Sequence, residues 1–282
     1  MKVGLVLEGG AMRGMYTCGV LDVFLDNNIK VDGIIGVSAG VLFGVNYLSN
    51  QKGRALRYNK KYAGYKKFMG LHSLITTGNI VNKDFAFYQV PLKEDIFDND
   101  TYKKSKVPFY AVVTNVRNGE AEYIRVKDVF KDMEVLRASS AMPIVSRMVK
   151  IKDDYYLDGA IADSIPFNKM KSLGYDKLIV VLTKPIGYRK KKELSRLTKL
   201  YYRKYPKLVN AILNRYNMYN NQLDEVLNLE QNGDIIVLRP SKKVKINRIE
   251  KDKNKIQEMY DLGVNDAIEN LDKIKKYLKI KK

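Results

Sequence analysis

Residues 31–40 read VDGIIGVSAG, and they give the strongest indication of the fold class in this sequence. The apolar segment Val31–Val37 has the composition of a buried strand and runs directly into Ser38, after which a helix-spaced apolar pattern begins. Gly36 and Gly40 flank the serine as Gly-x-Ser-x-Gly, and glycines here allow the sharp strand-to-helix turn that exposes a serine hydroxyl. The stretch predicts a strand–turn–helix unit with Ser38 as a nucleophile; a serine that only caps the helix is the alternative.

Outward from this unit, strands and helices alternate through the first two thirds of the chain. Such alternation is typical of one α/β domain with a parallel sheet. The expected strands are 3–7, 31–37, 109–116, 122–126, 177–183 and 235–238, with a strand or hairpin over 149–157; the expected helices are 15–28, 41–48, 129–136, 190–230 and 253–280.

The character of the sequence changes near residue 186. Residues 1–185 carry the alternating pattern and are predicted to form the catalytic domain, whereas residues 186–282 are predicted to form a basic, mostly helical region packed on it or appended to it. Within the first part, residues 51–105 are polar and weakly periodic. They predict an insertion or cap with short helices, which would act as a lid if it covered Ser38.

The chain is strongly basic. Its formal net charge is +20, and 24 Lys/Arg against 12 Asp/Glu place +12 of this in residues 186–282. Such an excess favours anionic partners such as phospholipid head groups, nucleic acid or acidic proteins, and a lysine-rich solvated surface is the alternative. With no membrane-span or signal pattern and with Cys18 as the single cysteine, we expect a cytoplasmic protein with peripheral contact to an anionic membrane.

A serine nucleophile needs a base, and histidine is scarce in this chain. The single histidine, His72, lies in the polar insertion and precedes every later acid, so a surface or capping role is expected for it. The base is then a carboxylate. Asp158 is the best candidate because it closes an apolar segment and is followed by the small residues Gly159 and Ala160; an ordinary Asp-Gly turn is the alternative.

A third motif is the loop of residues 9–14, Gly-Gly-Ala-Met-Arg-Gly, which follows the first expected strand. Adjacent glycines near a helix start present unhindered N–H groups that suit an oxyanion or a phosphate. The phosphate patterns fail, because Gly14 is not followed by Lys-Ser/Thr and the spacing does not read Gly-x-Gly-x-x-Gly. An oxyanion hole is therefore the better interpretation.

Together these motifs resemble those of the patatin-like phospholipase family. The family's marks are a Gly-Gly-x-x-Arg-Gly loop, a Gly-x-Ser-x-Gly elbow and a distant Asp-Gly-Gly/Ala motif, and residues 9–14, 36–40 and 158–160 match them in order. The small-residue stretch 138–143 and Pro166 resemble the segments that bracket the family's aspartate. The resemblance covers about residues 1–185 and implies a three-layer α/β/α fold with a mostly parallel central sheet.

The resemblance also implies a mechanism without a cofactor or a metal. Asp158 would accept the proton of Ser38 as the serine attacks a lipid acyl ester, forming an acyl-enzyme. Backbone N–H groups of the glycine loop would hold the oxyanion, with positive potential from an arginine; these residues are Gly9, Gly10, Ala11 and Arg13. The chain departs from the family pattern at Glu8, Ala160 and Asp163-Ser164, and none of these departures touches the serine or the aspartate.

Two competing functions stay open. The same residues could serve a soluble carboxylesterase or thioesterase, or the chain could be a basic membrane- or nucleic-acid-binding protein with a vestigial site. No nucleic-acid motif supports the latter, so we expect no nucleic-acid partner. The expected final helix over 253–280 combines apolar residues with many lysines. That pattern fits docking at a lipid surface, but we favour a helix that packs on the core.

Overall fold

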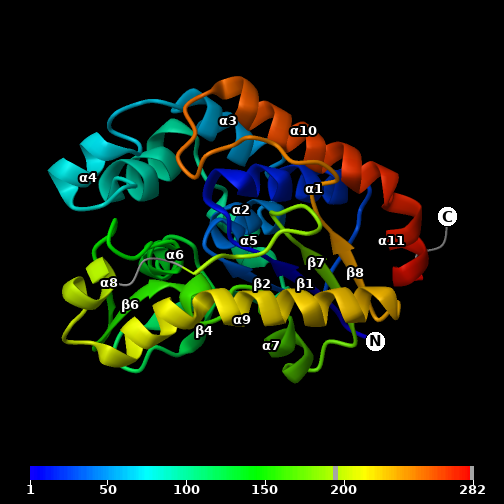
Figure 1. The fold of residues 1–282 in the computed structure, drawn as a ribbon. Helices are drawn as coiled ribbons and strands as arrows, with labels where there is room; N and C mark the ends of the chain where they lie inside the picture. Colours follow the sequence, from blue (N-terminus) through cyan, green and yellow to red (C-terminus); the bar gives the residue numbers. More distant parts are fainter. Residues whose placement is uncertain (193–195, 280–282) are drawn as a thin grey trace.

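The computed structural model describes residues 1–192 and 196–279, which form a three-layer α/β/α fold around one sheet (Figure 1). The sheet has the order β5-β6-β3-β2-β1-β7-β8, and β4 pairs with β3 off this path. Its strands are β1 (Val3–Leu7), β2 (Gly33–Val37), β3 (Phe109–Asn115), β4 (Ala121–Val126), β5 (Val149–Ile151), β6 (Asp154–Asp158), β7 (Lys177–Val181) and β8 (Ile235–Leu238).

The central strands run parallel, as the alternation of elements predicts. β1 pairs in parallel with β2 and with β7, and β2–β3 and β7–β8 are parallel too. The antiparallel part is the edge formed by β4, β5 and β6, and β6 pairs with β3 so that Asp158 stands opposite Val113. Because the carboxyl ends of β1 and β2 meet at one edge, the glycine loop and Ser38 come together there.

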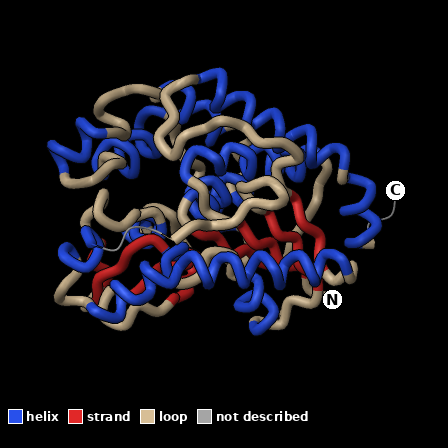
Figure 2. The backbone as a smooth tube through the Cα atoms, viewed as in Figure 1, coloured by secondary structure: helices blue, strands red, loops and turns tan. Residues whose placement is uncertain are grey.

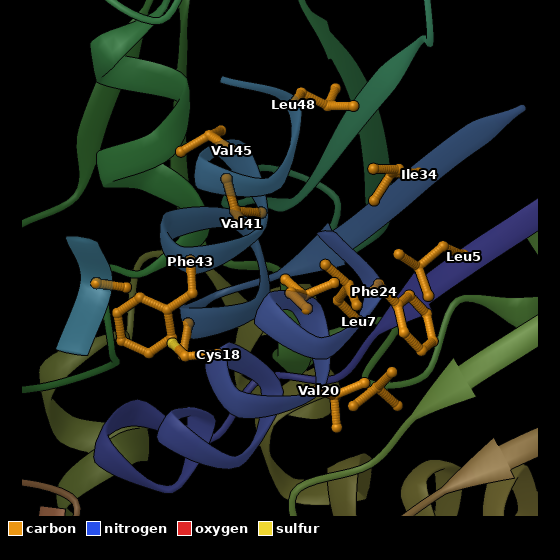
Figure 3. Close-up of a cluster of buried hydrophobic side chains, with 14 of the residues drawn as sticks. Leu5, Leu7, Cys18, Val20, Phe24, Ile34, Val41, Phe43, Val45 and Leu48 are labelled. Carbon is orange, nitrogen blue, oxygen red and sulfur yellow. The ribbon is translucent and has the colours of Figure 1, made fainter. Parts of the chain in front are cut away.

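Alternate residues of β1 face opposite layers. Leu5 and Leu7 belong to the core on one face of the sheet, and Val6 belongs to the core on the other. Figure 3 shows Leu5 and Leu7 beside Phe24, within the first of these cores. A strand buried on both faces needs the continuous apolar run that the sequence shows here.

Helices cover both faces of the sheet (Figure 2). Residues of α1 (Met15–Asp26), α2 (Ala39–Leu48) and α10 (Lys253–Glu269) fill the core with Leu5 and Leu7. On the other face, α7 (Phe167–Ser172) and the 26-residue α9 (Pro206–Gln231) pack with Val6. Thus β8 and two long helices from the C-terminal third are integral to the three layers.

The α1–α10 contact depends on two glycines. A methyl group on Gly19 would lie 2.2 Å from the carbonyl oxygen of Tyr260, and one on Gly263 would lie 2.1 Å from that of Tyr16. Neither distance leaves room for a side chain, so the two backbones approach each other closely. Tyr260 also donates a hydrogen bond of 2.7 Å to Asp22, which fixes α10 further along α1.

The segment 51–105 folds into short helices, as predicted. They are α3 (Arg54–Lys61), α4 (Leu71–Thr77), the π-helix η2 (Lys83–Glu94) and α5 (Asn99–Lys104). An aromatic cluster of Tyr62, Phe68 and Phe85, joined by Val90, holds this segment together. Although the segment is polar in composition, it therefore has a small core of its own.

The sequence-based boundaries are wrong in several places. The single helix expected over 253–280 is two helices, α10 and α11 (Leu271–Leu278), because the chain leaves helical geometry at Asn270, whose side chain donates to the Asp266 carbonyl. The helix expected over 129–136 begins later, as α6 (Met133–Ser139), after a turn in which Asp128 accepts from the Phe130 and Lys131 N–H groups.

Within the described part of 190–230 the helices are α8 (Arg196–Tyr201) and α9. Residues 193–195, and residue 280 of the helix expected over 253–280, lie outside the described residues. The apolar side of α10 packs on the core, with Ile256 and Met259 buried. α10 thus packs on the core as expected, and contact with an anionic membrane stays a prediction. The division of the chain at residue 185 stays a prediction.

Candidate active site

Ser38 sits in a strained turn between β2 and α2. Its backbone has φ 54° and ψ −119°, a left-handed conformation that non-glycine residues rarely adopt. The flanking glycines make the turn possible: a methyl group on Gly36 would lie 2.9 Å from the backbone of Gly40, and one on Gly40 would lie 2.4 Å from the Leu7 carbonyl oxygen. The geometry is that of a nucleophile elbow.

Asp158 reaches Ser38 from the end of β6. It is 5% exposed, it accepts a hydrogen bond of 2.9 Å from the Ala160 N–H, and it lines the same cavity as Ser38. Burial raises the pKa of Asp158 above its ordinary value, against the opposing effects of the Arg215 charge, the Ala160 N–H and the Ser38 hydroxyl. A methyl group on Gly159 would lie 2.2 Å from the Val112 carbonyl oxygen, so this position needs glycine.

Ser139 stabilises the elbow through two hydrogen bonds, a role that sequence reasoning did not assign. Its hydroxyl accepts a hydrogen bond of 3.0 Å from the Ser38 N–H and donates one of 2.7 Å to the Val112 carbonyl of β3. The hydroxyl is fully buried and satisfied on both sides. The small-residue stretch 138–143 was the signal in the sequence, although it did not single out this serine.

The glycine loop lies against the nucleophile. A methyl group on Gly9 would lie 2.8 Å from the Ser38 Cβ, and Ala11 adopts a positive φ of 49°. Among the described residues, no hydrogen-bond acceptor is found for the N–H groups of Gly9, Gly10 or Ala11. These donors remain available beside Ser38; their role as an oxyanion hole stays a prediction. Arg13 is half-buried in the same loop, and burial together with the nearby Arg248 lowers its pKa.

Glu8, which directly follows β1, is buried, and both of its carboxyl oxygens accept hydrogen bonds. It accepts hydrogen bonds from the Thr183 N–H and, at 2.7 Å, from the Tyr219 hydroxyl, and the Thr183 hydroxyl lies 3.0 Å from both the Glu8 carboxyl and the Gly9 carbonyl. Burial raises the pKa of this carboxyl. Glu8 therefore connects the start of the glycine loop to Thr183 and to Tyr219 of α9.

Two cavities meet at Ser38. One, of about 130 Å³, is apolar and runs beneath the segment 51–105; the other, of about 310 Å³, is polar and contains Asp158. Ser38, Ala11 and Met142 line both. The apolar cavity is walled mainly by side chains of α2, the 51–105 segment and α6, among them Leu42, Phe43, Tyr58, Phe68, Phe87, Val90, Phe97, Met133 and Leu136. The segment 51–105 is thus a cap over the apolar cavity.

Two residues weighed in the sequence lie elsewhere. His72 is exposed on α4, and Cys18 is buried in the core on α1. Within the described ranges, no group of three or more His, Cys, Asp or Glu side chains could hold a metal ion, and no helix is long and apolar enough to cross a membrane.

The three-layer fold, the strained serine elbow and the buried aspartate are the features that the sequence motifs predict. The chain belongs to the patatin-like phospholipase family, whose model matches residues 5–170. Residues 205–279 match a second model, a domain of unknown function, DUF6363. The three-layer fold predicted from the resemblance is confirmed.

Several relatives share the first part of the chain. An uncharacterized protein, YjjU, from Escherichia coli is 31% identical over 195 residues, covering 65% of this chain and 52% of its own length. Fungal proteins named lysophospholipase NTE1 are 27% identical in Coccidioides immitis and 28% identical in Aspergillus fumigatus, each covering 64% of this chain. These fungal proteins are far longer, since the match spans only 11% and 12% of their lengths.

Among solved structures, VipD from Legionella pneumophila aligns with a TM-score of 0.47 at 12% sequence identity, over 96% of this chain and 67% of its own.

Proposed function

We propose that this protein is a lipid acyl hydrolase of the phospholipase A type that uses Ser38 as nucleophile and Asp158 as base. The observation that carries the proposal is the position of Ser38, which lies where an apolar cavity meets a polar cavity that also contains the buried carboxyl of Asp158. Membership of the patatin-like phospholipase family and the lysophospholipase names of the fungal relatives support the same reaction class.

The reaction would proceed through an acyl-enzyme. Asp158 takes the hydroxyl proton as Ser38 Oγ attacks the ester carbonyl carbon, and N–H groups of Gly9, Gly10 and Ala11 receive the developing oxyanion. The protonated Asp158 then gives its proton to the departing alcohol. A water molecule, deprotonated by the same carboxylate, attacks the acyl-enzyme, and the proton returns to Ser38 as the acid leaves.

A raised pKa suits Asp158 to this work. An ordinary aspartate is a weaker base than the imidazole of a serine–histidine pair by about 2.6 pKa units. Burial raises the pKa of Asp158 and so recovers part of that basicity. The cap of residues 51–105 also keeps the acyl side of the site apolar, which is the surrounding a hydrocarbon chain needs.

The test is hydrolysis of p-nitrophenyl esters, from acetyl to dodecanoyl, by wild type, Ser38→Ala and Asp158→Asn. We expect kcat to fall on the order of 10⁶-fold for the serine variant and 10⁴-fold for the aspartate variant, as in other serine hydrolases. Matched controls are Ser49→Ala, a buried serine at the end of α2, and Asp163→Asn, a buried aspartate hydrogen-bonded to Tyr123. Both controls should keep wild-type rates.

The chain-length trend separates the candidate functions. Rates that rise toward long acyl chains support a lipid substrate, whereas a maximum at acetyl or butyryl would indicate a soluble esterase. Activity that survives in folded Ser38→Ala would contradict the proposal and leave a binding protein as the better explanation. Labelling by a fluorophosphonate, read by mass spectrometry, would show directly whether Ser38 is the residue modified.

A further inference from the structure

The polar cavity beside Ser38 is lined by an excess of positive side chains. Two acidic residues, Glu8 and Asp158, face five basic residues across it. The basic residues are Arg13, Lys184, Lys190, Arg215 and Arg248. Of the two carboxyls, Glu8 is already held by Thr183 and Tyr219, so it is not free to neutralise a neighbour.

Within the described residues, four of the five basic side chains of this cavity lack the carboxylate partners that such groups usually have. Among the described residues, no carboxylate lies within 4.0 Å of the charged groups of Arg13, Lys184, Arg215 or Arg248. Lys184 instead lies over the Tyr188 ring, with Nζ 5.1 Å from its centroid. Arg13, Lys184 and Arg215 are half-buried. Burying a cation without a counter-charge is costly, and a ligand that supplies the negative charge would remove that cost.

Arg215 gives the most specific sign of a missing ligand. Its Nε–H is enclosed, yet it has no hydrogen-bond partner among the described atoms. The guanidinium lines the cavity with Asp158 and exerts the largest charge effect on that carboxyl, so it lies close to the reacting groups. Arginine presents a planar set of donors that matches the oxygens of a phosphate.

The cavity has room for such a group. A water molecule needs about 10–15 Å³ measured in the same way, and this cavity offers about 310 Å³. Its connection to the apolar cavity through Ser38 would place the acyl chain on one side of the serine and the alcohol portion of the ester on the other. In a glycerophospholipid the phosphate is part of that alcohol portion, only a few bonds from the ester.

We propose that the polar cavity binds the phosphate of a phospholipid head group through Arg215 and Lys184 and selects lipids of net negative charge over zwitterionic ones. This inference rests on the proposed acyl hydrolase function. A quaternary ammonium would be repelled by the cations of the cavity, whereas a phosphate without a cationic substituent meets an excess of complementary charge. Arg215 lies beyond the part of the chain that matches the patatin-like model, as does Lys184, so the selectivity belongs to the rest of the chain.

The test uses the full-length protein and short-chain lipids kept monomeric, because a chain of charge +20 would bind any anionic micelle. We compare kcat/KM on dihexanoyl phosphatidate with kcat/KM on dihexanoyl phosphatidylcholine. We expect wild type to prefer the anionic ester by at least about 10-fold, the size of one charge-assisted hydrogen bond. Equal rates on the two lipids, with Ser38-dependent hydrolysis intact, would overturn the inference and leave the proposed function standing.

Two variants locate the selectivity. Arg215→Gln and Lys184→Met should each reduce the preference for phosphatidate about 10-fold, and Arg215→Lys should retain more of it than Arg215→Gln. The matched control is Lys207→Gln, an exposed charge on the same helix as Arg215, which should leave the preference unchanged. Fluorophosphonate labelling of Ser38 in each variant shows that the site is folded. A preference that survives in labelled Arg215→Gln and Lys184→Met would contradict the assignment.

Competition identifies the chemical group that is recognised. Glycerol 3-phosphate and inorganic phosphate should inhibit hydrolysis of p-nitrophenyl butyrate by wild type more strongly than by Arg215→Gln. Stronger inhibition by glycerol 3-phosphate points to a lipid head group, and equal inhibition by the two points to phosphate alone as the recognised group. Absence of inhibition by both would overturn the inference. Absence of any ester hydrolysis by wild type would instead refute the proposed function.

Discussion

Tyr219 of α9 donates a hydrogen bond of 2.7 Å to Glu8, the residue that directly precedes the glycine loop. The two residues are 211 positions apart in the chain. This bond connects the C-terminal third to the loop that lies against Ser38, so a change in α9 can reach the candidate site without touching substrate.

We expect Tyr219→Phe to destabilise the protein by about 1–3 kcal/mol, because it leaves a buried carboxyl oxygen without its donor. The measurement is urea unfolding at neutral pH. Tyr216→Phe is the control on the same helix, since its hydroxyl makes no hydrogen bond to a described residue. Equal stability of the two variants would mean that the Glu8 contact contributes nothing measurable.

The strain at Ser38 predicts a difference between two inactive variants. Ser38→Gly can adopt the positive φ without steric cost, whereas Ser38→Ala keeps the strain. We therefore expect the glycine variant to be more stable than the alanine variant by about 1 kcal/mol. Thermal unfolding of both proteins checks this, and a more stable alanine variant would show that the turn is relaxed.

The buried carboxyl of Asp158 predicts a pH-dependent stability change. Because its pKa is raised in the folded protein, stability is lost as the pH rises from the unfolded-state pKa through the folded-state value. Asp158→Asn should therefore raise the melting temperature at pH 7 and lose this advantage in acid, where the wild-type carboxyl is protonated in both states. In wild type, kcat/KM should rise with pH through the same raised pKa. A pH–rate profile that is flat from pH 4 to 8 would contradict a raised value.

The lowered pKa of Lys184 predicts a change in stability at neutral to basic pH. Burial, with the positive charges of Arg13, Arg248 and Lys190 and against the attraction of Glu8, lowers its pKa to about 7. Between that value and the ordinary pKa of lysine the unfolded chain binds more protons, so this group makes stability rise with pH. Lys184→Met should melt at a higher temperature than wild type at pH 7, with a smaller difference at pH 10.

Lys207→Met, an exposed lysine on α9, is the control for Lys184→Met and should change the melting temperature little at either pH. A lower melting temperature for Lys184→Met at pH 7 would show that Lys184 stabilises the fold. That result would argue that the residue serves structure and not ligand binding.

The crossing of α1 and α10 predicts a severe packing defect. Gly263→Ala would place a methyl group 2.1 Å from the Tyr16 carbonyl oxygen, so α10 has to move. We expect a loss of about 1–3 kcal/mol or more, as for other overpacked cores. Asn265→Ala, an exposed position on the same helix, should cost little. Chemical denaturation of both variants checks the difference.

The motifs of the candidate site could be predicted from the sequence because each is local. Glycines on both sides of Ser38 are required by the elbow itself, and Gly159 is required by the Val112 carbonyl beside it. The parallel sheet then brings the ends of β1 and β2 together without further information. Asp158 could be selected as the candidate base because the scarcity of histidine favours a carboxylate.

The surroundings of the site could not be predicted, because they depend on contacts between distant segments. Arg215 is one of 24 basic residues in the C-terminal third, and nothing in its neighbours marks it as the one beside Asp158. Ser139 and Tyr219 act through hydrogen bonds to residues about 100 and 200 positions away. The break at Asn270 was missed because the apolar spacing continues into α11.

The order of the elements along the chain also determines when the candidate site can be completed during synthesis. A chain still being synthesised, with only its first 200 or so residues outside the ribosome, already contains Ser38 and Asp158 but not β8 or α10. The side of α1 that α10 covers is then exposed. The polar cavity still lacks the residues that α9 contributes, Ile212, Arg215 and Tyr219. The cavities that meet at Ser38 receive their last lining residues, Arg248 and Ile249, only after α9 and β8 have left the ribosome.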